Sequence, residues 1–354
     1  MTTALATQVA FKEKAPEGHF GADLPDASAA ILQARIKDLQ LHLKGTRLER
    51  FIGQLYEELE AKGISLRPQC YLSDQWGCPS GVPVIGIPFY LADPQLTQIE
   101  DRLGSGAEDE REIMMYLRHE AGHAFNYAYK LYETDEWRKL FGDFGKPYLE
   151  TYKPRPFSRK YVIHISGWYA QKHPDEDFAE TFAVWLTPDS RWAERYKGWG
   201  AIKKLQYMEG VITKLGRTPA PVTLDERDLD VGEMEETVLD HYRQRQLAEK
   251  IDLQIGEQLD QDLMNLFEAA GAADVRADTL IRAERQGLIS AVTQYSGVSR
   301  AAIVSVLEHL SERTNKLNLT VKRDMAHVYT TRLTSLVTAL AMNYLYTDRF
   351  FETD

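Results

Sequence analysis

Cysteine is scarce in this sequence, which contains only Cys70 and Cys78 among its 354 residues. Two cysteines are too few for the disulfide framework of small secreted domains. Uncharged apolar runs are also short, and the best candidate, residues 333–345, falls below the ~20 residues that span a bilayer. Residues 1–26 contain no apolar segment of the kind that a signal peptide needs. We therefore expect a cytoplasmic protein with no membrane partner and with reduced thiols; a disulfide between the two cysteines is the alternative.

Positive charge is also in short supply. The chain has 42 lysine and arginine residues against 53 acidic residues, which gives a net charge of −11. An acidic surface repels phosphate backbones, so nucleic acid is not an expected partner. The phosphate-binding patterns GxxxxGKS/T and GxGxxG and the serine-hydrolase pattern GxSxG do not occur. No motif therefore supports nucleotide hydrolysis or serine chemistry.

The composition is that of an ordinary globular protein, with 44% hydrophobic and 27% charged residues. A chain of this length predicts two domains or one large one. Apolar residues recur at helical spacing or in short extended runs up to about residue 215, and the rest is compatible with long helices. The expected helices are a helical hairpin over about 28–62, a segment from 93, and helices over 108–132, 174–186, 201–215, 234–270, 274–294, 298–315 and 319–347. The expected strands cover 70–72, 82–91 and 161–165.

This pattern predicts an α+β domain followed by an all-α helical bundle. Glycine, prolines and an acidic run between residues 216 and 233 are typical of a linker. The domain boundaries that we expect are a flexible tail at 1–26, the α+β domain at 27–217, an acidic linker at 218–233 and the helical domain at 234–354.

The segment His119-Glu120-Ala121-Gly122-His123 is the strongest indication of chemistry. It lies within the expected helix 108–132, where positions i and i+4 share a face. Two neutral imidazoles on one face can bind a single zinc ion. Glu120 lies about 100° further round the helix and is placed to take a proton from an attacking water as general base. A pair of surface histidines on an amphipathic helix is the alternative interpretation.

A zinc site of this kind needs a third ligand. The pattern HExxHxxGxxH is excluded, because Asn126 and Tyr129 occupy the positions that would need glycine and histidine. Downstream, Glu176 and Glu180 are again four residues apart on an expected helix. One hypothesis is that Glu176 binds zinc while Glu180 accepts a hydrogen bond from the distal nitrogen of His119.

The two carboxylates could also exchange these roles, with Glu180 as ligand and Glu176 behind the histidine. A solvated acidic face, common in an acidic protein, is a further alternative. His173 is a less suitable ligand, because it precedes Pro174 and is expected to lie outside the helix.

The motif HEAGH, with HPDEDFAETFAVWL downstream and SDQWGCPSGVPVIGIPFYLADPQL upstream, resembles the bacterial family described as putative zinc-binding metallopeptidases. The resemblance covers roughly residues 30–218. The pattern is also similar to the gluzincins, and among them to the anthrax lethal factor type, where HExxH is followed by ExFAE. That likeness implies that Glu176 is the ligand, that Glu180 supports a histidine, and that Tyr169, seven residues before Glu176, is catalytic. It further implies a zincin-like domain whose active-site helix lies beneath a small sheet with an edge strand that binds an extended peptide.

From the motifs and this resemblance, we expect a zinc metallopeptidase that hydrolyses peptide bonds with one Zn²⁺ per chain. The substrate would be a peptide or protein, and Tyr169 would donate a hydrogen bond to the oxyanion of the transition state. The alternative is a catalytically silent zincin-like protein that acts as a binding or scaffold module through its helical domain. That domain is also the expected site of any homo-oligomer or protein-partner contact.

Overall fold

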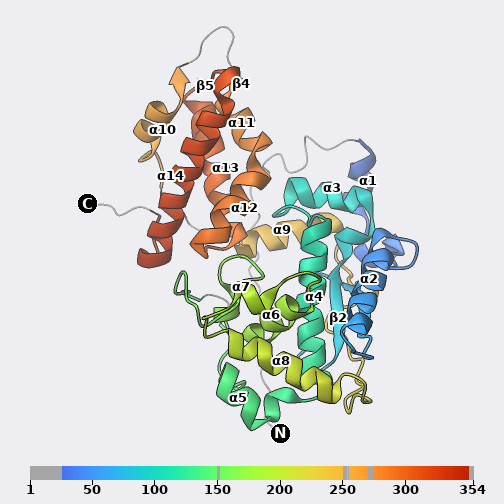
Figure 1. Ribbon diagram of the computed structural model, residues 1–354. Helices are drawn as coiled ribbons and strands as arrows, with labels where there is room; N and C mark the ends of the chain where they lie inside the picture. Colours follow the sequence, from blue (N-terminus) through green and yellow to red (C-terminus); the bar gives the residue numbers. More distant parts are fainter. Residues whose placement is uncertain (1–25, 150–151, 250–252, 254, 270–274, 351–354) are drawn as a thin grey trace.

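The computed structural model describes residues 26–149, 152–249, 253, 255–269 and 275–350. In this part of the chain, buried apolar side chains form two large clusters, one from Leu32 to Tyr242 and one from Ile255 to Phe350. Figure 1 shows the helices of the second cluster, coloured orange to red, as a group beside the first. The predicted fold class, an α+β part followed by a helical part, is confirmed. The domain boundaries stay a prediction, and all of the expected tail except Asp26 lies outside the described residues.

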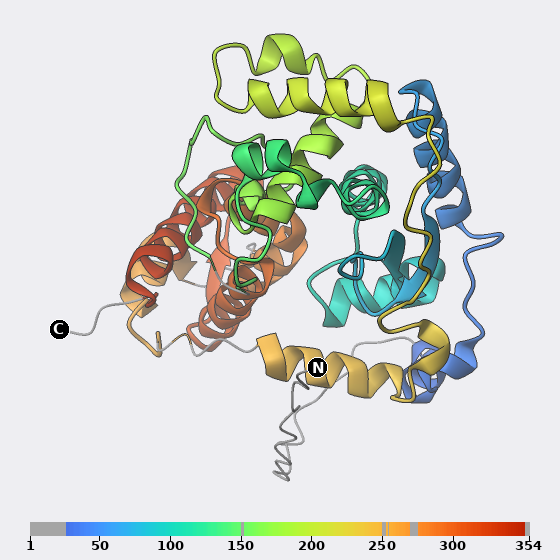
Figure 2. The same ribbon diagram turned by 90° about the horizontal axis from the view of Figure 1, so that it is seen from below.

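The first part is arranged around one long helix, α4 (Glu110–Ala128), which is seen end-on near the centre of Figure 2. Its N-terminus has a capping box, in which the Asp109 side chain accepts from the Glu112 amide at 2.8 Å and the Glu112 side chain accepts from the Asp109 amide at 3.1 Å. The other helices of this part are α1 (Asp26–Gln33), α2 (Arg47–Ala61), α3 (Pro94–Leu103), α5 (Asp135–Phe141), α6 (Pro174–Leu186), α7 (Trp192–Arg195), α8 (Ile202–Leu215) and α9 (Val238–Glu249), and its 3-10 turns are η1 (Ile36–Leu39), η2 (Phe89–Ala92), η3 (Leu131–Glu133), η4 (Tyr169–Gln171) and η5 (Val231–Glu233).

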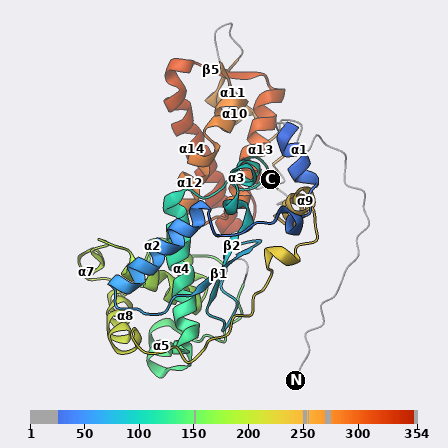
Figure 3. The ribbon, with the colours of Figure 1, turned by 90° about the vertical axis from the view of Figure 1, so that its right-hand side faces the viewer.

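Two parallel strands, β1 (Gln69–Ser73) and β2 (Val84–Pro88), lie beside α4 (Figure 3). Gln69 pairs with Val84 at one end and Ser73 with Pro88 at the other. The expected strands at 70–72 and 82–91 are therefore confirmed in position, although the second ends at Pro88 and the chain continues as η2. Both cysteines are free thiols.

The strand expected at 161–165 is wrong, and side chains explain why. The amide of Ile163 donates to the Tyr196 hydroxyl at 3.1 Å, and the amides of His164 and Ile165 donate to one carboxylate oxygen of Glu180 at 3.2 and 2.9 Å. These side chains take the N–H groups that a neighbouring strand would otherwise bind. Among the described residues, the segment pairs with no strand.

Helices α4 and α6 cross closely at Gly122. A Cβ atom at this position would lie 2.8 Å from the Cα atom of Ala179 in α6, too close for any residue except glycine. Alanine or glycine on both sides lets the two backbones approach, so side chains next to the crossing face each other across a short gap. The crossing therefore determines how His123, the residue after Gly122, lies relative to α6.

The helical part contains α10 (Asp260–Leu266), α11 (Ala277–Ala283), α12 (Arg285–Ser296), α13 (Arg300–Lys316) and α14 (Ala326–Thr347), with the turn η6 (Arg323–Met325). It also holds short antiparallel strands that the sequence did not predict, β3 (Glu268–Ala269), β5 (Leu319–Val321) and β4 (Val275–Arg276), in that spatial order.

Three expected helices are therefore wrong in extent: 234–270 divides into α9 and α10, 274–294 into α11 and α12, and 319–347 begins with a strand. Residues 250–252, 254 and 270–274 of these segments lie outside the described residues. The helix expected at 298–315 is confirmed as α13.

The two parts meet at the ends of helices. Arg300, at the start of α13, lies 3.7 Å from the Glu112 carboxylate of α4. Gly297, which follows α12 with a φ of 74°, approaches the backbone of Gly167, where a Cβ would lie 3.4 Å from the Gly297 Cα. The Tyr152 hydroxyl donates to the Gly167 carbonyl at 2.9 Å. The loop before η4 is thus held from two sides. Among the described residues, no helix combines the length and apolar character of a membrane span.

Candidate metal centre

His119 and His123 on α4 meet Glu176 on α6. One atom of each, Nε2 of both imidazoles and Oε2 of the carboxylate, lies within 3.0 to 3.3 Å of the other two. All three side chains are buried. A tetrahedral zinc ion with ligand bonds of ~2.0–2.1 Å separates its ligand atoms by about 3.3 Å. The spacing of the three atoms therefore fits a single zinc ion.

The carboxylate behind His119 is Glu180, which is fully buried. Its Oε1 lies 3.0 Å from His119 Nδ1, and its Oε2 accepts from the amides of His164 and Ile165. A carboxylate that accepts at Nδ1 favours the tautomer with a lone pair on Nε2. Glu180 lies on the far side of the ring from Nε2, so the exchanged assignment, with Glu180 as the ligand, does not match this placement.

The carboxylate behind His123 is Asp175, which the sequence interpretation did not identify. Asp175 Oδ2 lies 3.0 Å from His123 Nδ1, an ion-pair distance without the alignment of a hydrogen bond. The amide of the Asn126 side chain donates to Asp175 Oδ1 at 2.8 Å, and the Tyr127 hydroxyl donates to Oδ2. The only sequence signal for this role is the position of Asp175 directly before Glu176 in the first turn of α6.

Charge in the cluster favours a cation. Burial lowers the pKa of His119, but hydrogen bonds to Glu176 and Glu180 outweigh burial and raise it to about 9. Burial also opposes the charged form of His123, yet the charges of Asp175 and Glu176 raise its pKa well above the usual range. Burial raises the pKa of Glu176, and the two imidazoles reverse this and hold it well below its ordinary value. The site thus stabilises positive charge, whether protons or a metal ion.

Glu120 occupies the remaining predicted position on α4. Its side chain is buried and lines a cavity of about 410 Å³ that opens onto the three-atom cluster. Burial raises the pKa of its carboxyl group above the ordinary value. In the described part of the chain, this carboxylate makes no hydrogen bond, so it is available to a water molecule or a substrate. The cavity is lined by Trp76, Gly77, Cys78, Ser80, His119, Glu120, His123, Tyr127, Phe144, Lys146, Tyr148, Tyr169, His173, Asp175 and Glu176.

Two tyrosines form one wall of this cavity. The Tyr169 hydroxyl lies 3.4 Å from Glu176 Oε1, and the Tyr148 hydroxyl donates to the same oxygen and lies 3.3 Å from that of Tyr169. Burial is the main cause that raises the pKa of both phenols above 10, so both are neutral donors at neutral pH. Tyr148 was not predicted, since the Gly- and aromatic-rich segment around it gives no periodic signal.

The other histidines near the site are bound to the backbone. His173 accepts from the Asp175 amide at 3.2 Å and contacts the Lys146 carbonyl at 3.1 Å, so both of its ring nitrogens are occupied outside the cluster. His164 contacts the Met115 carbonyl at 2.9 Å, and burial lowers its pKa. Neither joins the three-atom cluster.

Comparison with known protein families gives one match, which covers the elements of the candidate metal centre. Residues 85–193 match the family model described as "Putative zinc-binding metallo-peptidase". This match confirms the family resemblance predicted from the sequence and includes α4, α6 and the whole three-atom cluster, although it covers under a third of the chain. The metallo-peptidase match does not test the likeness to the lethal factor type. No curated protein and no solved structure matches the chain.

Proposed function

We propose that this protein is a zinc-dependent metallopeptidase in which His119, His123 and Glu176 hold one Zn²⁺. The proposal is carried by one observation: three buried atoms that can each bind a metal lie 3.0 to 3.3 Å apart, with carboxylates behind both imidazoles. Atoms at this spacing need a proton or a metal ion between them, and one zinc ion can bind all three at once. We also propose a cytoplasmic location, for which the two free thiols are the support.

When bound, zinc supplies a Lewis acid that polarises a carbonyl and lowers the pKa of water. Glu120 then acts as general base, taking the proton of the attacking water and passing it to the leaving amine. Burial, which raises the pKa of this carboxyl, makes the carboxylate a stronger base. Glu180 and Asp175 keep the two imidazole rings in the orientation and tautomer that bind metal.

Tyr169 is proposed to donate a hydrogen bond to the oxyanion that develops on the scissile carbonyl. Its hydroxyl faces the same cavity as the Glu120 carboxylate and is anchored to Glu176 Oε1 in the free protein. The phenol of Tyr148 lies next to it and is the second available donor. A peptide or protein substrate is proposed on the basis of the family match.

The test compares Glu120→Gln with the wild-type chain, both loaded with zinc, on a fluorogenic peptide library. We expect zinc content to stay at one per chain and turnover to fall by about 10²–10⁴-fold, because only the base is lost. Glu110→Gln is the matched control: it lies on the same helix, is exposed and pairs with Arg50, and should leave turnover unchanged. Zinc-loaded wild-type protein that cleaves no peptide would favour the silent scaffold instead, and normal turnover in Glu120→Gln would remove this residue from the mechanism.

A further inference from the structure

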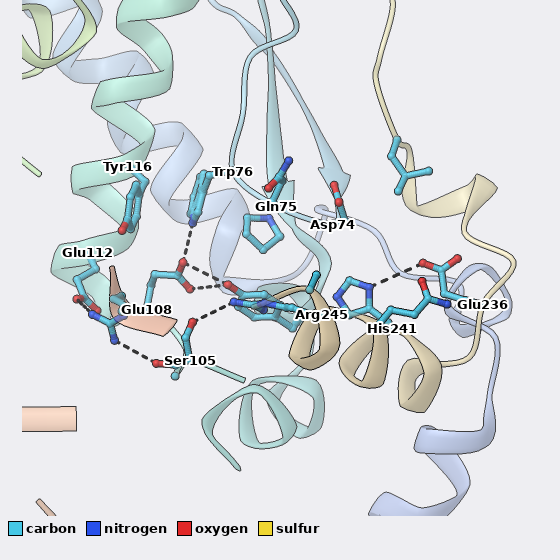
Figure 4. Close-up of a pocket in the computed structure, with 17 residues that line it drawn as sticks. Asp74, Gln75, Trp76, Ser105, Glu108, Glu112, Tyr116, Glu236, His241 and Arg245 are labelled. Carbon is cyan, nitrogen blue, oxygen red and sulfur yellow. Dashed lines mark hydrogen bonds and ion pairs between the residues drawn. The ribbon is translucent and has the colours of Figure 1, made fainter. Parts of the chain in front are cut away.

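A second and larger hollow, of about 610 Å³, lies beside the N-terminal half of α4 (Figure 4). Asp74 and Trp76 reach it from the segment after β1, His241 and Arg245 from α9, and Arg300 from α13 of the helical part. The hollow therefore lies where the two parts of the molecule meet, a common location for ligand sites.

The hollow and the candidate metal cavity are neighbours along α4. Glu112 and Tyr116 line the hollow, while Glu120 and His123 line the metal cavity, and these positions follow one another at helical spacing on one face. Trp76 lines both. With a rise of 1.5 Å per residue, the hollow begins about 6 Å from Glu120 and extends to about 12 Å. An extended peptide covers that distance in about two to four residues.

Trp76 is held firmly at the border of the hollow and the metal cavity and lines both. Its ring stacks on Tyr116 with centroids 5.5 Å apart and an interplanar angle of 20°. Its Nε1 donates to Glu108 Oε1 at 2.9 Å, and the Tyr90 hydroxyl donates to Glu108 Oε2 at 3.1 Å. An aromatic wall of this kind can pack against the aliphatic stem of a long side chain.

The two arginines of the hollow are already paired. Arg245 lies 3.1 Å from the fully buried Glu100 and donates to the Ser105 hydroxyl at 3.0 Å. Arg300 lies 3.7 Å from Glu112 and donates to the Ser105 carbonyl at 3.3 Å. Both guanidinium groups are thus turned toward protein acceptors, which disfavours an anionic ligand.

The other acidic side chains of the hollow have no lysine or arginine side chain as a partner among the described residues. Among the described residues, no lysine or arginine pairs with Asp74, Glu108 or Glu236, which all line the hollow. His241 lies 3.8 Å from Glu236, and burial and the nearby Arg245 lower its pKa, so it is mainly uncharged at neutral pH. Burial raises the pKa of Glu108, which already accepts from Trp76 and Tyr90, so the negative charge of the hollow rests mainly on Asp74 and Glu236.

We propose that this hollow is a substrate subsite that binds the lysine or arginine side chain of a peptide, about two to four residues from the bond next to Glu120. The aliphatic stem lies against Trp76, and the cationic head lies near Asp74 and Glu236. The proposal rests on the proposed function only for the position of the peptide along α4, since binding of the cation does not require turnover.

The test measures peptide binding in the Glu120→Gln background, so that no substrate is consumed. The probes are short end-blocked fluorescent peptides with a single lysine, moved one position at a time, and matched peptides with norleucine in its place. Fluorescence anisotropy should give a Kd about tenfold lower for the best lysine peptide than for its norleucine partner. Equal affinity for every pair would overturn the proposal.

The double variant Asp74→Asn and Glu236→Gln tests whether the preference for lysine arises in this hollow. It removes two charges while keeping side-chain size, and we expect the lysine preference to disappear. Asp135→Asn, which removes an exposed charge at the start of α5, is the matched control and should keep the preference. If the double variant does not fold, Asp74→Asn alone should reduce the preference about threefold. A preference that survives these changes would refute the assignment.

The two proposals fail separately. If the wild-type protein cleaves none of the peptides but binds lysine more tightly than norleucine, the hydrolase fails and the subsite stands. If it cleaves each lysine peptide and its norleucine partner with the same kcat/KM and binds them equally, the hydrolase stands and the subsite is wrong.

Discussion

Replacing Asp175 with asparagine tests whether a charge behind His123 supports metal binding. In the wild-type protein, Asp175 lies 3.0 Å from His123 Nδ1 and accepts from the side chains of Asn126 and Tyr127. Within the described residues, Asn126 Oδ1 has no hydrogen-bond partner, so this amide can turn and accept from the new NH₂ group. Asp175→Asn therefore preserves size and local hydrogen bonding and removes mainly the charge.

The expected loss of zinc affinity is about 10–100-fold, the range measured when a carboxylate that supports a metal-binding histidine is replaced. This corresponds to about 1.4–2.8 kcal/mol of binding free energy. Competition with a chromophoric zinc chelator at neutral pH gives the Kd, and circular dichroism of the zinc-free proteins checks that the fold is unchanged. Asp135→Asn, an exposed aspartate, controls for the change in net charge. A folded Asp175→Asn protein with wild-type zinc affinity would refute the reasoning.

Three further predictions concern stability. In zinc-free protein the pKa of His119 is raised from 6.5 to about 9, so protonation of this imidazole stabilises the folded state. The contribution is complete below pH 6.5 and is lost as the pH rises through 9. Thermal unfolding across this range should therefore show a falling Tm, and an unchanged Tm would contradict the shift. Gly122→Ala places a Cβ 2.8 Å from Ala179 Cα and should lower the free energy of unfolding by about 1–3 kcal/mol and weaken zinc binding. Gly210→Ala in α8, where nothing lies within 4 Å of the added Cβ, should instead raise it by about 0.5–1 kcal/mol in denaturant titrations.

The sequence predicted the members of the three-atom cluster because their pattern is local. His119 and His123 share a face of α4 through helical spacing alone, and the pair of glutamates does the same on α6. That Glu176 rather than Glu180 faces the imidazole Nε2 atoms depends on how the helices cross, which the family resemblance supplied and the spacing did not. The roles of these residues stay part of the proposed function.

The errors arise where tertiary contacts decide the local structure. The apolar run at 161–165 is typical of a strand, but its amides bind the carboxylate of Glu180 and the hydroxyl of Tyr196. The long helix expected at 234–270 is interrupted because Tyr242 and its neighbours in α9 pack into the first core, whereas Leu263 of α10 packs into the second. Periodicity indicates which residues are buried, but it does not indicate in which of two cores.

The contact between Gly167 and Gly297 makes the helical part a support for one side of the cavity at the three-atom cluster. Because two backbones touch there without intervening side chains, the loop that leads to Tyr169 is fixed by residues more than a hundred positions away in the sequence. The spacing of the three-atom cluster depends on the crossing of α4 and α6 within the first core. The position of the tyrosine wall depends on the second core as well, so a chain shortened before α10 would keep the three-atom cluster while losing the brace for Tyr169.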